Sequence, residues 1–344
     1  RIARAELTPR FTDWGQERML LQQVLLDGVS LEADALTRLA GWSARQPKAP
    51  LLVSRVDLAQ VRLLVPGVEL PPFGGRLLWD GGQLREAVLT TADRRATLNL
   101  QPLAGGWRAQ LTAGRWTPPV GVNLEFDRLD VQGVARDQTL TITALNGELY
   151  GGRVAGSGQV SWARGWQAVF DLDIAGVNLA TALPAFTRAL RAEGTLAAKA
   201  RVQLAADRLG LLTASPTVRA TFVAREGTLG NVDLVRAINA AARSAVTGGE
   251  TRFNGFSGYL ELAGGRYRYQ QLRLNLGMLS AAGSAVIEAD GRLAGDVVTE
   301  LRSRSATLRV PLTVEGTLEA PTLRGRGTPR AGPAPAAAPA ETQP

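Results

Sequence analysis

The sequence predicts a mainly β protein built around an antiparallel sheet, with a few amphipathic helices. Apolar and polar residues alternate in many short segments from Leu51 onward, and this period of two is the pattern of a half-buried strand. Glycine occurs 38 times and separates most of these segments in turn-forming positions. Few segments have helical spacing, so we expect a sheet that grows by successive hairpins.

The composition excludes several classes of functional site. The chain has no cysteine and no histidine, so it cannot form a disulfide, a Ser-His-Asp triad or a zinc site with histidine ligands. The net charge of +8 comes almost wholly from arginine, because Lys48 and Lys199 are the only lysines. The arginines lie singly in predicted strands. No aromatic residue interleaves with the late group from Arg302 to Arg326, so we expect no nucleic-acid partner.

Residues 1–45 are predicted to form a helical or linker segment. Residues 16–26 and 30–42 have helical patterns, and Ser30 is a candidate cap for the second helix. The chain opens on Arg1 rather than Met, which suggests that a preceding segment has been removed. No run reaches the roughly 18 apolar residues that a membrane-spanning helix requires.

Residues 46–204 are predicted to form a β-rich region. A pair of strands is expected over residues 51–65. Two hairpins are then expected, with turns at Asp80-Gly81-Gly82 and Ala104-Gly105-Gly106. Later strands follow the same alternation up to residue 204.

One helix is expected to interrupt this β-rich region. It runs from Asn178 to about Arg191, with Asn178 or Thr181 as its cap and Pro184 tolerated in its first turn. A second unit of helix followed by strands occurs over residues 230–262, which indicates a weak internal repeat.

Residues 205–324 are predicted to hold a second helix and then at least four short strands. The helix is expected over residues 231–246 and to pack on the sheet through a narrow apolar stripe. That stripe comprises Leu234, Ile238, Ala241 and Ala245. Residues 325–344 are rich in proline and alanine and are expected to be disordered.

Three local patterns have a chemical interpretation and a simpler structural one. Gly156-Ser157-Gly158 lacks the further glycine and lysine of a phosphate-binding loop, and a plain strand is favoured. Asp171 and Asp173 alternate with apolar residues, which is typical of the solvent face of a strand. The late arginines could meet lipid head groups, but a solvated face is favoured. This last group comprises Arg302, Arg304, Arg309, Arg324 and Arg326.

The order of several short segments resembles the carboxy-terminal region of the AsmA-like family. Leu149-Tyr150-Gly151-Gly152 is similar to a phrase common in the repeats of that family. The other matching segments are Glu226-Gly227-Thr228-Leu229, Val232-Asp233-Leu234, residues 253–262, residues 274–286 and the closing strand from Val310-Pro311-Leu312 to Pro321.

The resemblance implies an elongated, curved sheet shaped like a trough, in a protein of the Gram-negative cell envelope. Such proteins lie in the periplasm, anchored to the inner membrane, so a transmembrane helix is expected before Arg1. The implied role is non-enzymatic: outer-membrane biogenesis, or phospholipid transport and homeostasis, with acyl chains held in an apolar groove. No catalytic, cofactor or metal residue is expected.

The apolar strand residues that would serve this role are either the floor of a groove or part of a closed core, and the sequence does not decide between them. They are Leu272, Leu274, Leu276, Leu308, Val310 and Leu312. The alternative function is a scaffold or assembly factor that meets a secretion or outer-membrane protein machine through its sheet edges.

Overall fold

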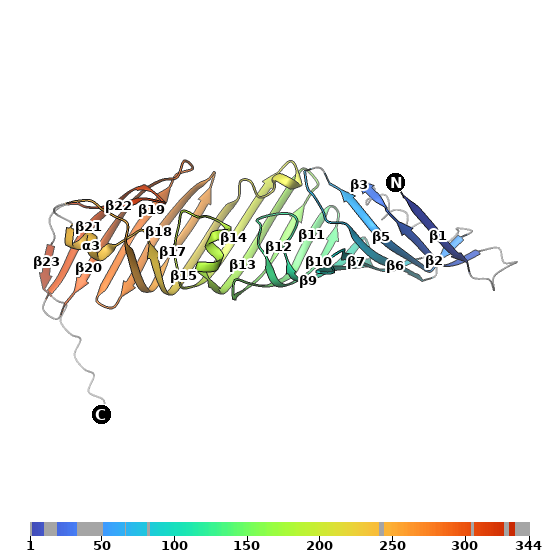
Figure 1. Ribbon diagram of the computed structural model, residues 1–344, viewed down its shortest axis with the longest axis horizontal. Coiled ribbons are helices and arrows are strands. Elements are labelled where there is room, and N and C mark those ends of the chain that lie inside the picture. Colours follow the sequence, from blue (N-terminus) through green and yellow to red (C-terminus); the bar gives the residue numbers. More distant parts are fainter. Residues whose placement is uncertain are drawn as a thin grey trace, which may run out of the picture. The chain divides into compact units, whose positions relative to one another are not determined.

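A computed structural model describes residues 2–9, 19–32, 51–65, 67–80, 83–240, 244–303, 306–326 and 330–333. Strands dominate it, and the prediction of a mainly β, antiparallel fold with few helices is confirmed (Figure 1). The chain forms two compact units. The N-terminal unit comprises Arg1–Leu149, Arg153–Leu172 and Val202–Pro216, and the C-terminal unit comprises Tyr150–Gly152, Asp173–Arg201 and Thr217–Pro344.

The N-terminal unit is a sheet in which most strands pair with their neighbours along the chain. Antiparallel pairing runs from β5 through β11 without a break, whereas β2 is parallel to β4 and β5, and β3 is parallel to β5. The strands are β1 (Arg4–Pro9), β2 (Met19–Asp27), β3 (Ser30–Glu32), β4 (Leu51–Val53), β5 (Arg55–Leu64), β6 (Phe73–Asp80), β7 (Gln83–Thr91), β8 (Ala96–Leu103), β9 (Gly106–Trp116), β10 (Phe126–Arg136), β11 (Thr139–Leu149) and β12 (Gly152–Ser161).

Two strands and one short helix belong to the region where the two units meet along the sequence. These are β13 (Trp166–Asn178), β14 (Thr195–Ala206) and the 3-10 helix η3 (Leu209–Leu211). The apolar side chains of β14 alternate with exposed polar ones, as the sequence predicts.

The prediction of a helix over residues 16–26 is wrong. Residues from Met19 onward form strand β2, which pairs with β1 on one side and with β4 and β5 on the other. Leu21 and Val24 are buried on this strand, whereas the predicted helical pattern rested on Met19, Leu20, Val24 and Leu25. Strand partners on both sides therefore outweigh the local pattern. The second predicted helix falls mostly on residues 33–42, outside the described residues, and Ser30 begins β3.

Both predicted hairpins are confirmed. Strands β6 and β7 pair up to Asp80 and Gln83, and β8 and β9 pair up to Leu103 and Gly106. Small residues face the interior of this unit, where buried Ala96, Ala113 and Leu129 form a core cluster.

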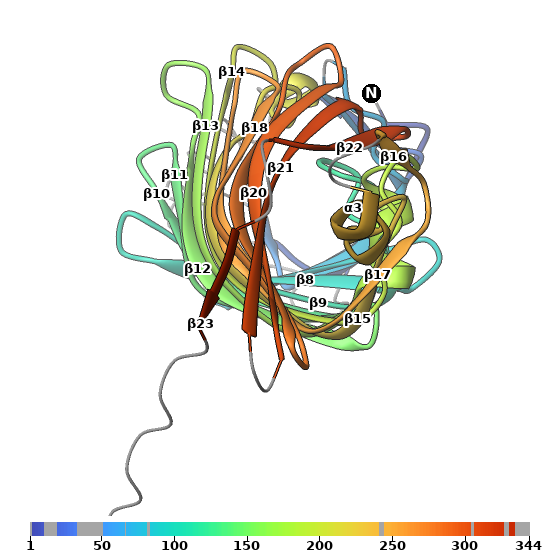
Figure 2. The ribbon, with the colours of Figure 1, turned by 90° about the vertical axis from the view of Figure 1, so that its left-hand side faces the viewer.

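The C-terminal unit is a curved antiparallel meander in which β15 pairs with β17 and each later strand pairs with the next up to β22. Its strands are β15 (Thr217–Gly230), β16 (Val246–Thr247), β17 (Glu250–Ala263), β18 (Arg266–Leu276), β19 (Leu279–Ile287), β20 (Arg292–Arg302), β21 (Ala306–Thr317), β22 (Pro321–Gly325) and β23 (Arg330–Pro333). Figure 2 shows helix α3 (Leu234–Ala240) on the concave side of this wall, beside β16 and β22.

The helix expected from Asn178 is much shorter than predicted. It comprises α2 (Leu179–Ala182) and a 3-10 turn, η2 (Leu183–Ala185). The predicted cap is confirmed, because the Asn178 side-chain oxygen accepts hydrogen bonds from the amides of Ala180 and Thr181. The chain then bonds to β15 by its backbone, which removes residues 191–193 from any helix.

The second helix is also shorter than the predicted span of 231–246. Leu234 and Ile238 are buried as expected, but Ala245 is exposed and Val246 pairs with Leu323 of β22. The ladder between β16 and β22 therefore ends the helical run. Ala241 lies outside the described residues.

The prediction of disorder from residue 325 is wrong for residues 330–333. These form β23, which pairs with residues 306–309 of β21. Strand β22 covers only residues 312–316 of the same edge, so the preceding backbone groups of β21 are free to take a second partner. Residues 334–344 lie outside the described residues.

Within the described residues, no helix has both the length and the apolar character needed to cross a membrane.

The core of the C-terminal unit makes a stability prediction. We expect Leu312→Ala to lower the free energy of unfolding by about 2–5 kcal/mol, because Leu312 is only 1% exposed. Val298→Ala is the control: Val298 is 46% exposed, so the change should stay within about 0.5 kcal/mol. Urea unfolding of the full chain measures both. Equal losses in the two variants would contradict this packing.

Candidate apolar binding site

The six apolar residues predicted from the sequence lie in different surroundings. Val310 and Leu312 are buried in a closed core against α3, and half-buried Leu308 packs on that core. Leu272 and Leu274 line a pocket, and Leu274, which is 5% exposed, also belongs to the same buried core. Leu276 is half-buried at the end of β18, opposite Leu279. The six residues therefore include both core residues and pocket-lining residues, and Leu274 is both.

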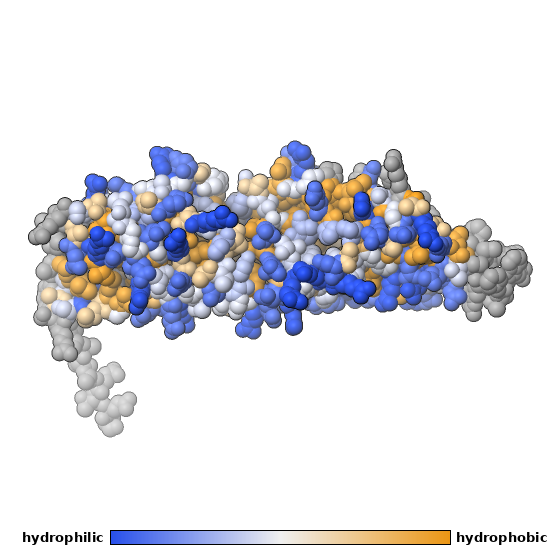
Figure 3. Space-filling model, in the orientation of Figure 1, coloured by the Kyte–Doolittle hydropathy of each residue, from blue (hydrophilic) through white to orange (hydrophobic). Residues whose placement is uncertain are grey.

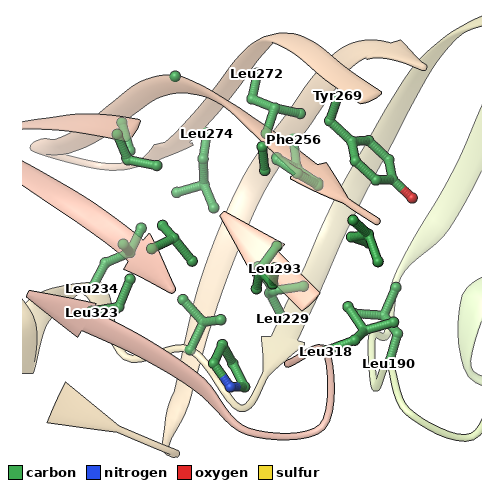
Figure 4. Close-up of a pocket in the computed structure, with 18 of the residues that line it drawn as sticks. Leu190, Leu229, Leu234, Phe256, Tyr269, Leu272, Leu274, Leu293, Leu318 and Leu323 are labelled. Atoms are coloured by element: carbon green, nitrogen blue, oxygen red, sulfur yellow. The ribbon is translucent and has the colours of Figure 1, made fainter. Parts of the chain in front are cut away.

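The pocket lies in the C-terminal unit and has a volume of about 190 Å³. It is partly open and contains no charged side chain in its lining (Figure 4). Most of the lining consists of leucine, valine, alanine and glycine. An engineered cavity of ~150 Å³ with similar apolar walls stays dry and binds benzene. This pocket therefore suits an apolar guest.

A row of small side chains on β19 gives the pocket its depth. Ala281, Gly283 and Ala285 alternate along the strand and all line the pocket. On one side, Leu274 of β18 pairs with Ala281, and on the other, Val297 of β20 pairs with Gly283. Small residues between rows of large ones leave a furrow in a sheet surface. The furrow over β19 is the floor of the pocket.

The opposite wall comes from segments that close over this furrow. Leu229 ends β15, Leu234 begins α3 and Leu323 lies on β22, and all three line the pocket. Leu190 and Leu318 complete the wall from two loops. Figure 4 places Leu234 and Leu323 on one side of the pocket, and Leu190 and Leu318 on another.

A buried threonine holds the start of α3 over the sheet. Thr251 of β17 is 3% exposed, and its hydroxyl donates to the Val232 carbonyl at 2.6 Å and accepts from the Leu234 amide at 3.0 Å. Asp233 caps the same turn by accepting from the Arg236 amide at 2.8 Å. Thr251 was not predicted from the sequence. The one indication of Thr251 in the sequence is that this polar residue stands two positions before Phe253, on the apolar face of a strand.

Tyr269 is the one lining residue with a polar side-chain group. Burial raises the pKa of its hydroxyl to about 12, with a smaller contribution from nearby Tyr267. The Tyr269 ring meets Phe222 edge to face, with ring centroids 6.4 Å apart. This residue was also missed, because a lone tyrosine in a strand is usual.

Apolar surface is incompletely covered elsewhere in both units. In the part of the N-terminal unit that the structure describes, η3 is the only helical turn, and alternate apolar residues of β12 such as Val154 and Val160 stay half-buried. In the C-terminal unit, Figure 3 shows apolar residues at the surface near α3, where Val235 is 52% exposed. Hydrophilic residues interrupt this surface.

The residues with a possible catalytic interpretation lie on the exposed faces of ordinary strands. Ser157 is exposed within β12, and Asp171 and Asp173 are exposed on β13. Asp173 lies 3.6 Å from the Lys199 ammonium. Among the described residues, no group of acidic side chains is arranged to hold a metal ion.

The late arginines are mostly paired with acids. Arg302 and Arg309 both contact Glu300, at 3.3 and 2.7 Å, and Arg326 contacts Asp296 at 3.0 Å. Arg324 is exposed, and Arg304 lies outside the described residues. The interpretation of this group as a solvated face fits the pairing better than a basic patch does.

Comparisons of the chain with models of protein families, with curated proteins and with solved structures find no match.

The anchor of α3 is open to test. Thr251→Val removes both hydrogen bonds to the start of the helix, and we expect it to destabilise this segment by about 1–3 kcal/mol. Faster hydrogen exchange at the Leu234 amide would report the loss. Thr251→Ser keeps the hydroxyl and should keep most of the protection. Unchanged exchange in the valine variant would show that packing alone holds α3.

The pKa of Tyr269 predicts a loss of stability at high pH. The folded state keeps the proton up to about pH 12, whereas an unfolded tyrosine loses it near pH 10. Between these values the unfolded state binds fewer protons, so stability falls as pH rises. Chemical unfolding at pH 9, 10 and 11 should show this slope, and Tyr269→Phe should reduce it. An identical slope in the variant would contradict the assignment.

Proposed function

We propose that the protein binds acyl chains of lipids, and that the pocket over β19 holds a segment of one chain. The observation that carries this proposal is a pocket of about 190 Å³ whose lining has a single polar side-chain group and no charge. An aqueous metabolite needs several convergent polar groups for recognition. A hydrocarbon chain needs none.

Burial of a hydrocarbon segment in the pocket contributes a substantial free energy of binding. By proportion to the ~150 Å³ cavity that takes benzene, the pocket accommodates roughly seven carbon atoms. At about 0.8 kcal/mol for each buried CH₂, such a segment contributes about 5 kcal/mol. The rest of the lipid would lie along the half-buried apolar face outside the pocket.

The biological setting follows from the resemblance to the AsmA-like family. We place the protein in the periplasm, tethered to the inner membrane by a segment outside this sequence, with a non-catalytic role in phospholipid transport or homeostasis and outer-membrane biogenesis. The absence of cysteine suits an oxidising compartment.

The direct test is lipid extraction from the full chain, purified without detergent, followed by mass spectrometry. We expect phospholipid in an amount comparable to the protein. A lipid-free sample that also fails to take up phospholipid from vesicles would overturn the proposal.

A pocket-filling variant links binding to this site. Ala285→Phe places a ring over the furrow of β19, and we expect it to lower bound phospholipid by about tenfold, which corresponds to ~1.4 kcal/mol. Ser284→Phe adds the same bulk one position away, on the exposed side of the strand, and should keep binding. Mass spectrometry and thermal unfolding of both variants give the comparison. Equal phospholipid binding by both variants would show that the lipid binds outside this pocket.

A protein scaffold is the second candidate. Among the described strands, β1 pairs only with β2, and its residues 4–8 are exposed, including Leu7 at 62%. A free strand edge can receive a strand from a partner. This function would be favoured if the purified protein contains no lipid and binds an envelope assembly protein, and if the substitution Leu7→Lys abolishes that binding.

A further inference from the structure

The single polar group of the pocket is placed at one end of it. Figure 4 shows the Tyr269 hydroxyl at the edge of the lining, toward Leu190 and Leu318, whereas Leu234 and Leu323 lie at the other end. The pocket therefore has a polar end and an apolar end. This arrangement matches a ligand with one polar atom group and a hydrocarbon tail.

A β-bulge directs Tyr269 into the pocket. The register between β18 and β19 shifts between Tyr269 and Leu272, and Gln271 has a φ of 50°. In a regular strand, residues three apart point to opposite faces. The bulge lets Tyr269 and Leu272 share the pocket face, and bulges of this kind commonly re-aim a side chain beside a functional site.

The ring of Tyr269 is held by its neighbours. Phe222 contacts it edge to face, and its partner on β19 is Ala285, whose small side chain leaves the space over the ring open. The tyrosine is thus fixed in orientation while its hydroxyl remains available.

That hydroxyl has no hydrogen-bond partner among the residues that the structure describes. The hydroxyl is not a fully buried atom, so it is accessible to a ligand whose acceptor oxygen can replace a hydrogen bond to solvent. A tyrosine hydroxyl keeps its proton at physiological pH even at its ordinary pKa near 10, and burial raises the pKa of Tyr269 further, so this group acts as a donor. A ligand that supplies an acceptor oxygen at this point would complete the site.

We propose that Tyr269 donates a hydrogen bond to the ester carbonyl oxygen of a neutral acyl ester, whose tail runs over Leu272 and Leu274 toward Leu234. This inference rests on the proposed function and names the chemical class of its ligand. Tyr269 is a binding residue that selects acyl esters over plain hydrocarbons.

A neutral ester fits the site better than a carboxylate. The lining contains no cation, and an unpaired carboxylate loses its hydration at high cost in an apolar pocket. Arg268, the nearest arginine along the strand, is one residue from Tyr269 and pairs with Glu261 at 3.4 Å. It is therefore already engaged away from the pocket.

The test compares three ligands with the same number of non-hydrogen atoms: methyl pentanoate, octane and hexanoate. Each ligand competes with the dye Nile red for binding to the full chain. The part of the dye signal that disappears in Ala285→Phe is assigned to dye bound in the pocket. We expect Tyr269→Phe to weaken methyl pentanoate by about three- to tenfold, as one hydrogen bond implies, and to leave octane unchanged. Tyr267→Phe is the matched control, since Tyr267 lies two residues away outside the lining, and should change neither.

The other possible results of the competition experiment contradict either the role of Tyr269, the ligand class or the proposed function. If Tyr269→Phe weakens no ligand, or weakens ester and octane equally, the role of Tyr269 is wrong and the apolar pocket stands. If only hexanoate is weakened, the ligand is a fatty acid. If no ligand competes, the proposed function itself fails. The infrared carbonyl band of bound methyl pentanoate in the unmodified protein gives a second readout, because a hydrogen bond lowers its frequency and a free carbonyl would contradict the inference.

Discussion

The apolar face of the curved sheet in the C-terminal unit is larger than the segments available to cover it, and the rest of the unit depends on this imbalance. Helix α3 and strand β22 close one end, where Val310 and Leu312 are nearly inaccessible to solvent. Beside them the cover is incomplete and the pocket begins. Hydrophobic burial favours hiding this surface. A bound hydrocarbon would do so where the chain itself does not.

The depth of the pocket and its roof have separate origins. Alternating small residues on β19 remove volume from the floor, whereas Thr251 fixes the start of α3 above it by two hydrogen bonds. Both features are needed for a pocket. Without α3 above them, the small residues of β19 would be part of an open sheet surface, and large side chains in their place would fill the space and form a closed core. The same sheet thus contains a closed core and an open pocket within a few strands.

The charged residues are distributed in a way that keeps this face apolar. Strand alternation places arginines and acids on the convex side, where Glu300 contacts both Arg302 and Arg309. Exposed pairs of this kind contribute little to stability. They keep the outer surface soluble while the inner positions remain free for leucine, valine and alanine. Recognition at the pocket then rests on shape and one hydroxyl.

The sequence by itself determined the strands, because a period of two with glycine turns is a local property; both predicted hairpins and the Asn178 cap follow from it. The predicted helices at residues 19–26 and at Val246 are strands instead, because strand partners outside each segment decide the conformation. The sequence also left core and groove undecided for Leu274 and Leu312. Only the tertiary structure shows that both lie in one core and that Leu274 also lines the pocket, since burial depends on which distant segment covers a position. The bulge that turns Tyr269 inward likewise depends on the register between strands.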